Sequence, residues 1–168
     1  MTKSILYLGN QLGRHAGKYT YMEGLSKLLR QDGFKVRMRS KQTNQLLRLI
    51  SMLWSILRYA RSSEVVLIDT YSTLGFWFAF LSARWCYILK IPYIPILHGG
   101  DLPKRLAKNP KLCHQLFNNA KINVAPSSYL MHHFEQAGYT NLVFIPNTIA
   151  LNHYDFKQRE RLKPNLLW

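Results

Sequence analysis

The chain has 168 residues, of which 48% are hydrophobic and 13% aromatic. This length suits one domain with a single buried core, and the composition excludes a disordered chain. The 23 Lys and Arg residues outnumber the 8 Asp and Glu residues and give a formal net charge of +15. That charge predicts attraction to polyanions, among which anionic membrane, nucleic acid and phosphorylated ligands are candidates.

Short apolar runs alternate with longer segments of helical period, and this alternation predicts βαβ units. The fold class that we expect is therefore α/β, with a mostly parallel sheet flanked by helices. The six expected strands are residues 4–8, 35–39, 65–69, 93–97, 122–125 and 142–145. A helix is expected over residues 19–31, and Gly33 would end it.

Residues 46–61 form a basic amphipathic pattern. The apolar side chains Leu46, Leu49, Ile50, Leu53 and Leu57 share one face, whereas the other face holds arginines and serines. Two interpretations stay open for this helix. It can cover the sheet with its arginines in solvent, or it can also touch anionic lipid.

A second long apolar segment, residues 74–91, carries Arg84 and Lys90 and is barely long enough to cross a bilayer. We expect a buried core helix there. The N-terminus lacks the pattern of a signal peptide, and Cys86 and Cys113 lack the spacing of a disulfide framework or a zinc site. These features predict reduced thiols, no metal and a cytoplasmic protein.

In open parallel sheets, ligands bind beyond the carboxyl ends of the strands, so the loops after the strands are the candidate sites. The first loop contains Gly9, Gly13, Gly17 and Lys18 and leads to a helix N-terminus, which favours phosphate. Its spacing matches neither GxGxxG nor a P-loop. A phosphate-facing loop and a flexible basic turn are both compatible with it.

The loop after residues 93–97 places His98 and Asp101 on either side of Gly99 and Gly100. His98 is the preferred catalytic-site candidate, because a histidine donates to a sugar hydroxyl or a phosphate near neutral pH. Asp101 can line the same cleft, although capping the helix that Pro103 starts is the favoured role.

Ser127 follows the strand at 122–125 and can either cap a helix at about 129–136 or offer its hydroxyl to a ligand in the cleft. No pair of glycosidase-like carboxylates and no Ser/His/Asp or Cys/His constellation is identifiable in the sequence. The chain therefore has the pattern of a binding domain.

These loops, in this order, resemble family 4 glycosyltransferases of the GT-B fold, and the resemblance covers essentially the whole chain. It is carried by the glycine-containing first loop, the run LRQDGFKV ending at Val36, the run LHGGD ending at Asp101, and VAPSSYL at 124–130 followed by VFIPNTI at 143–149. The resemblance implies a Rossmann-like domain. It also implies transfer from a nucleotide-diphosphate sugar to an acceptor with retention, without an essential metal or a cofactor.

The resemblance further implies two parts. Residues 1–150 would form the acceptor-side domain, with His98 near the donor sugar and the first loop near donor phosphate. Residues 151–168 would form the linker and the start of a C-terminal nucleotide-sugar domain, whose EX7E motif the sequence lacks. We therefore expect transfer only together with that domain. The Ala16-Gly17-Lys18 run departs from the family's common Gly-Gly.

The charge predicts a lipid-linked or glycan acceptor in cell-envelope synthesis, with the protein peripheral on the cytoplasmic membrane face. The candidate membrane or anion surface consists of Arg48, Arg58, Arg61, Lys104 and Arg105. An alternative is a noncatalytic basic α/β module that binds anionic membrane or a partner chain. A homodimer through an exposed cleft face also stays open. Nucleic acid is not an expected partner, because no recognition motif is present.

Overall fold

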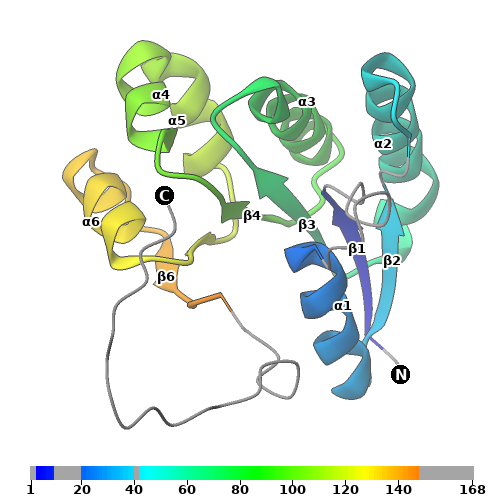
Figure 1. Cartoon of the computed structure of the whole chain (residues 1–168). Helices are drawn as coiled ribbons and strands as arrows, with labels where there is room; N and C mark the ends of the chain where they lie inside the picture. Colours follow the sequence, from blue (N-terminus) through cyan, green and yellow to red (C-terminus); the bar gives the residue numbers. More distant parts are fainter. Residues whose placement is uncertain (1–2, 10–19, 40–41, 148–168) are drawn as a thin grey trace, which may run out of the picture.

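Six parallel strands form one sheet within the residues that the computed structural model describes, which are 3–9, 20–39 and 42–147. Their order is β2-β1-β3-β4-β5-β6 (Figure 1). The strands are β1 (Ser4–Leu8), β2 (Lys35–Arg39), β3 (Val65–Thr70), β4 (Tyr93–Leu97), β5 (Asn123–Ala125) and β6 (Leu142–Phe144). The parallel α/β fold and all six expected strands are thus confirmed, and no strand end differs from its expected position by more than one residue.

β1 lies between β2 and β3 and is buried on both faces. Leu6 and Leu8 join the larger apolar core, whereas Ile5 and Tyr7 join a smaller core on the opposite face. A strand that is covered on both faces has no polar side to show. This is why its sequence reads as an unbroken apolar run.

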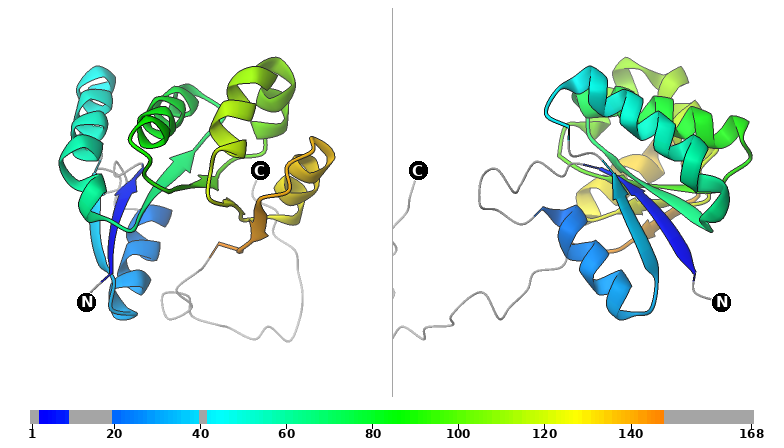
Figure 2. Two further views of the ribbon diagram at one scale, coloured as in Figure 1. Left: turned by 180° about the vertical axis from the view of Figure 1, so that it is seen from behind. Right: turned by 90° about the vertical axis from the view of Figure 1, so that its right-hand side faces the viewer.

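Helices cover the two faces unequally. Among the described helices, α1 (Tyr21–Gln31) alone packs against one face, and the others lie on the other side (Figures 1 and 2). Those helices are α2 (Gln45–Tyr59), α3 (Leu74–Ile88), α4 (Leu102–Lys108), α5 (Pro110–Asn118) and α6 (Ser128–Gln136). All five contribute side chains to the larger core.

Both ends of α1 are specified locally. Thr20 and Glu23 form a capping box, in which the Thr20 hydroxyl accepts from the Glu23 amide and the Glu23 carboxylate accepts from the Thr20 amide. Gly33 has a φ of 86° and allows the chain to turn back into β2. The predicted stop is confirmed.

Helix α2 covers the sheet, but it is rotated relative to the predicted leucine face. Its buried residues are Met52, Ser55 and Ile56, and Leu53 of the predicted face packs partly buried against the larger core. Leu46, Ile50 and Leu57 are exposed, so the expectation that the whole leucine face covers the sheet is wrong. The physical reason is that the sheet accepts the narrower stripe of Met52 and Ile56, with small Ser55 between them, and Ser55 bonds back to the Ser51 carbonyl.

Helix α3 is the buried core helix expected from the sequence, and Phe76, Phe80 and Cys86 lie inside the larger core. Within the described ranges, no helix is both long and apolar enough to cross a membrane. Cys86 and Cys113 are buried free thiols, and burial raises the pKa of Cys86 to about 12 and that of Cys113 to about 11.

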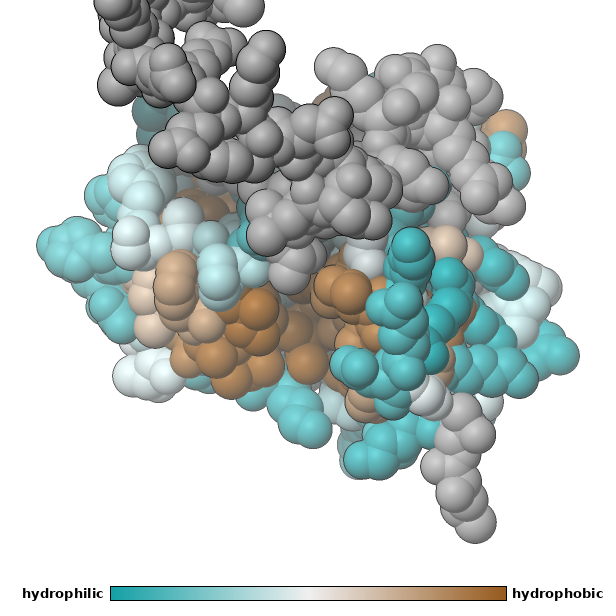
Figure 3. Space-filling model, turned by 60° about the horizontal axis from the view of Figure 1, so that its bottom comes forward, coloured by the Kyte–Doolittle hydropathy of each residue, from teal (hydrophilic) through white to brown (hydrophobic). Residues whose placement is uncertain are grey.

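The smaller core extends across the α1 side of the sheet. Ile96 of β4 and Val124 of β5 are buried in it, and Val143 of β6 packs against it. Figure 3 views the molecule from this side and shows apolar side chains gathered near the centre, with hydrophilic ones around them.

Candidate active site

The carboxyl ends of β1 and β3 meet at the point where the chain changes direction across the sheet. From β1 the chain passes through α1 to the edge strand β2, and it then returns past β1 to β3. Because the connections that leave β1 and β3 run to opposite faces, a crevice opens between them. Gly9 and Asp69 stand at these two strand ends.

Asp69 is the centre of a buried polar cluster. Its Oδ1 atom accepts a hydrogen bond of 2.8 Å from the Tyr7 hydroxyl, and Nε2 of His98 lies 3.0 Å from the same oxygen. Asp69 is 6% exposed and His98 is 8% exposed. The cluster therefore joins β1, β3 and the loop after β4 through side chains largely removed from water.

Two tyrosines hold the His98 ring. Tyr71 stacks on it with ring centroids 4.8 Å apart, and Tyr21 meets it edge-on at 5.2 Å. Burial, with the negative charge of Asp69 as a smaller contribution, raises the pKa of Tyr71 to about 12 and raises that of Tyr21. The pKa of Tyr7 is raised further, by burial first and then by Asp69. All three phenols stay protonated at neutral pH.

This geometry selects one tautomer of His98. An ionised carboxylate only accepts, so Nε2 of His98 carries the hydrogen that faces Asp69. In the neutral imidazole, Nδ1 is then left as an acceptor. The cluster can thus present an oriented acceptor nitrogen or, after protonation, a cation compensated by Asp69.

Gly9 is required by the position of Asp69. A Cβ atom at residue 9 would lie 2.1 Å from Oδ2 and 2.7 Å from Cγ of Asp69. Any larger side chain would displace the carboxylate. Among the glycines of the first loop, Gly9 therefore has a packing role at the strand end.

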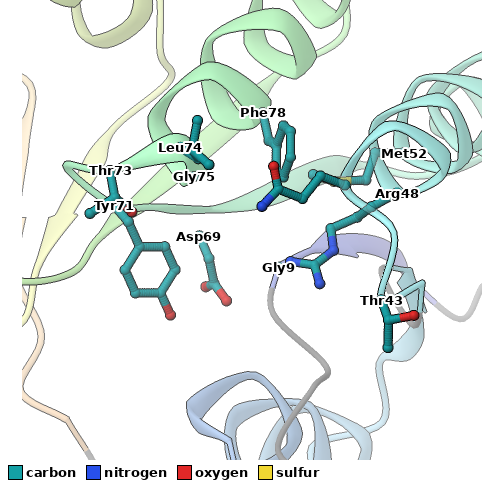
Figure 4. A pocket seen from close by; sticks show the side chains of 11 residues that line it. Gly9, Thr43, Arg48, Met52, Asp69, Tyr71, Thr73, Leu74, Gly75 and Phe78 are labelled. Carbon is teal, nitrogen blue, oxygen red and sulfur yellow. The ribbon is translucent and has the colours of Figure 1, made fainter.

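A cavity of about 380 Å³ opens beside the cluster (Figure 4). Arg48 reaches into it from α2, while Asp69 and Tyr71 face it from the end of β3. Nε of Arg48 donates to the Gln42 carbonyl at 2.9 Å, and burial lowers the pKa of the guanidinium. The rest of the lining comes from both strand ends, α2 and α3: Gly9, Thr43, Gln45, Met52, Thr73, Leu74, Gly75 and Phe78.

The volume of this cavity suits a small ligand. Because the guanidinium of Arg48 and the carboxylate of Asp69 lie on facing sides, the ligand should be polar and carry hydroxyl or anionic groups. His98 is not part of this lining but contacts two residues that are, Tyr71 and Asp69.

The sequence-predicted residues after β4 and β5 do reach the same edge of the sheet. Gly99 and Gly100 are exposed, and the Gly100 carbonyl accepts from the Tyr129 hydroxyl at 3.3 Å. Ser127 caps α6 by accepting from the Leu130 amide at 3.3 Å, as predicted.

The predicted capping role of Asp101 is wrong. The residue occupies the position before α4 but makes no side-chain capping bond, because its carboxylate pairs with Lys104 at 2.8 Å. Both side chains of this pair are well exposed. Asp101 and His98 are therefore not brought together by a shared hydrogen bond.

The basic residues expected on one surface have different environments. Arg58 and Arg61 are exposed, Arg48 lines the cavity, and Lys104 is paired with Asp101. Arg105 is half-buried, donates to Ser72 and Asn109, and lies 5.0 Å from the centre of the Phe76 ring. Its guanidinium is engaged within the domain.

Two groups of predictions lie outside the described residues. These are the phosphate-facing Gly13, Gly17 and Lys18, and the linker at 151–168. In the part of the chain that is described, no three His, Cys, Asp or Glu side chains come together as metal ligands.

Sequence reasoning missed Asp69, Tyr7 and Tyr71 as site residues. A signal for Asp69 was present, because it is a carboxylate at the end of a buried apolar strand, next to the expected crevice. Tyr7 gave no such signal, since a tyrosine inside an apolar run is typical of a core strand.

Comparisons with known proteins give one family match. The model of Glycosyltransferase Family 4 matches residues 21–153. No curated protein matches the chain. Among solved structures, the chain is similar to a putative UDP-N-acetylglucosamine 2-epimerase from Listeria monocytogenes, with 11% sequence identity and a TM-score of 0.48. The match covers 84% of this chain and 44% of that structure's chain, so this chain spans less than half of that protein's length.

Proposed function

Because this chain belongs to glycosyltransferase family 4, we propose that its described domain is the acceptor-side half of a sugar-transferring enzyme. The reaction would move a sugar from a nucleotide-diphosphate donor to a lipid-linked or glycan acceptor, with retention and without a cofactor. Residues 1–150 would form this half, and a C-terminal domain that begins within 151–168 would bind most of the donor.

The cavity between Arg48 and Asp69 is the observation that supports this proposal. It lies at the carboxyl edge of the sheet, at the crossover between β1 and β3, where ligands of such folds bind. A half-buried guanidinium suits an anionic group on the acceptor, and a carboxylate suits a hydroxyl. The cavity is therefore the proposed acceptor site.

The His98 cluster would line the donor sugar beside that site. Because Nε2 of His98 donates its hydrogen to Asp69, Nδ1 is free to accept a hydrogen bond from a sugar hydroxyl. The stacked Tyr71 keeps the imidazole ring in one orientation. His98 would thus be a contact residue, and Asp69 its positioning residue. Such preorganisation lowers the entropy lost on binding.

The experiment is a transfer assay with nucleotide sugars and a lipid extract. The chain would be assayed alone and then with a C-terminal GT-B half supplied. Activity only in the second state is the expected result. Absence of transfer in both states, with every common donor and with donor binding by the supplied half verified, would overturn the proposal.

A variant tests the acceptor cavity within that assay. Arg48→Gln is expected to raise the KM for an anionic acceptor about tenfold or more, while the KM for the donor stays unchanged. Arg84→Gln is the matched control, because Arg84 is exposed on α3 and is not part of this cavity lining. Equal effects of the two substitutions would remove the cavity from the proposal.

A further inference from the structure

Helix α2 exposes an apolar stripe on the side that faces away from the sheet. Its members are between 50% and 66% exposed and are Leu46, Leu47, Ile50, Trp54 and Leu57. Spacings of three and four residues stack such side chains on one helical face. The opposite face, with Met52 and Ile56, is buried. The stripe is therefore a continuous surface, not a set of isolated apolar residues.

The neighbouring helix also has exposed apolar side chains. α3 packs against α2 and exposes Leu74, Trp77 and Ile88. Contiguous exposed apolar patches on a folded domain mark interaction sites. Neither helix contains an acidic residue, and between Asp32 and Asp101 the chain carries only Glu64 and Asp69.

Three arginines converge on one ring at the C-terminal end of the stripe. The guanidinium carbons of Arg37, Arg39 and Arg58 lie 5.3, 5.1 and 5.2 Å from the centre of the Tyr59 ring. Trp54 of the stripe meets the same ring edge-on at 6.0 Å, although Tyr59 itself is partly buried and packs against the larger core. The positive cluster therefore lies next to the apolar stripe, between the end of α2 and the edge strand β2.

This cluster has a charge that the described residues leave uncompensated. The ion pairs there join His98 with Asp69 and Lys104 with Asp101, and neither involves the three arginines. Like charges held this close repel one another, and cation–π contacts offset only part of that repulsion. An anion with several oxygen acceptors would complete the arrangement, since arginine binds phosphate through two parallel hydrogen bonds.

We propose that α2 docks on an anionic lipid surface. The stripe would enter the boundary between headgroups and acyl chains, where amphipathic helices with a basic edge bind. The exposed Trp54 would sit at headgroup level, which tryptophan prefers. The cluster of Arg37, Arg39 and Arg58 would hold lipid phosphates.

Charge decides between this occupant and a second copy of the chain. Each copy carries a formal net charge of +15, so association of two copies through α2 would have to overcome the repulsion between them. An anionic bilayer supplies both an apolar interior and the opposite charge. The stripe and the cluster are therefore explained by one partner.

Docking of α2 on a membrane does not depend on the proposed transferase activity. Its consequence for the acceptor, which would be lipid-linked, does depend on that activity. On its inner side the same helix carries Arg48 and Met52, which line the cavity. If that cavity binds the acceptor, docking would bring it close to an acceptor anchored in the bilayer. The substrate class would then be lipid-linked, which rests on the proposed function.

The test is co-sedimentation of the full chain with vesicles, in the absence of donor and acceptor. Vesicles of phosphatidylcholine alone would be compared with vesicles that contain phosphatidylglycerol. One variant combines Ile50→Ser with Leu57→Ser, and its control is Leu28→Ser, which is 42% exposed on α1. A second variant changes Arg37, Arg39 and Arg58 to Gln, and its control changes the exposed Lys104, Lys108 and Lys111 to Gln.

The expected result is binding to the anionic vesicles only, reduced about tenfold by the stripe variant and about a hundredfold by the arginine variant. Each control should change binding less than about threefold. Circular dichroism would verify that every variant is folded. Because no sugar is transferred, failure of the transferase proposal would leave this result untouched.

Three outcomes would overturn the inference. The first is no binding of the unmodified chain to anionic vesicles. The second is a loss of vesicle binding that is as large in each control as in the variant it accompanies, which would indicate nonspecific attraction of a basic protein to the anionic surface. The third is a dimer in light scattering that the stripe variant dissolves, which would assign the surface to a second copy.

Discussion

His98 and Asp69 are 29 residues apart in the chain, and Nε2 of the first lies 3.0 Å from Oδ1 of the second. The contact ties the loop after β4 to the end of β3 and fixes which ring nitrogen carries the hydrogen. Since Tyr7 donates to the same oxygen, Asp69 serves two buried donors. The carboxylate therefore determines both the stability and the geometry of this edge of the sheet.

Replacing Asp69 by Asn tests that dependence. The amide keeps the shape and its one oxygen can still face both donors, because Tyr7 and His98 already share Oδ1, but the negative charge is lost. We expect a loss of about 1–3 kcal/mol in the free energy of unfolding, because buried hydrogen bonds to a charged acceptor stabilise more than those to a neutral one. Urea unfolding measures it.

Asp101→Asn is the matched control, because Asp101 is exposed and pairs only with Lys104 among the described residues. Its expected change is below about 0.5 kcal/mol. If both variants lost the same free energy, Asp69 would have no special place in the fold.

Substitution of Gly9 tests the close approach of β1 to Asp69. In Gly9→Ala the new methyl group would lie 2.1 Å from Oδ2, so the carboxylate or the strand end must move. We expect a loss of about 1–3 kcal/mol in the free energy of unfolding, as for an overpacked core position.

Gly24→Ala should have the opposite sign. Gly24 lies within α1 and a Cβ atom there meets nothing within 4 Å, so alanine should stabilise the helix by about 1 kcal/mol. Thermal unfolding of both variants gives the comparison. If Gly9→Ala were as stable as the unmodified chain, the end of β1 could move away from Asp69 without a measurable loss of stability.

Arg105 can be separated from its neighbour Lys104, with which the sequence pattern grouped it. Arg105 donates to Ser72 and Asn109 from a half-buried position, so Arg105→Gln should cost about 1–3 kcal/mol of folding free energy. Lys104→Gln, at an exposed position, should give no measurable change. If the two variants were equally stable, the hydrogen bonds of Arg105 would not stabilise the fold, and Arg105 would be equivalent to an exposed surface cation.

The strands were predictable because parallel strands covered on both faces leave apolar runs, and SILYL and YIPIL are such runs. The helix ends were predictable where capping is local, as at Ser127 and Gly33. Such signals depend only on neighbours in sequence.

The orientation of α2 and the His98 cluster could not be predicted in that way. The apolar pattern of α2 shows that two faces differ but not which one meets the sheet, and here the sheet accepts Met52 and Ile56. The partners of His98 come from three other segments, at Asp69, Tyr71 and Tyr21. Contacts of this kind are set by tertiary packing and leave no periodic trace.

Alkaline titration tests the environment of Tyr71. Burial raises its pKa to about 12, so the folded state keeps the phenol proton above pH 10, where the unfolded chain releases it. The stabilising contribution is complete below about pH 10 and is lost as the pH rises toward 12, with a slope of at most about 1.4 kcal/mol per pH unit.

Tyr71→Phe removes that contribution to the slope while leaving the contributions of Tyr7 and the two thiols. We therefore expect the free energy of unfolding of the variant to fall less steeply between pH 10 and 12, with a constant difference from the unmodified chain below pH 9. Urea titrations at several pH values would measure both slopes. Parallel curves over the whole range would mean that Tyr71 titrates as an ordinary solvated phenol, and the stacked arrangement over His98 would then have to be abandoned.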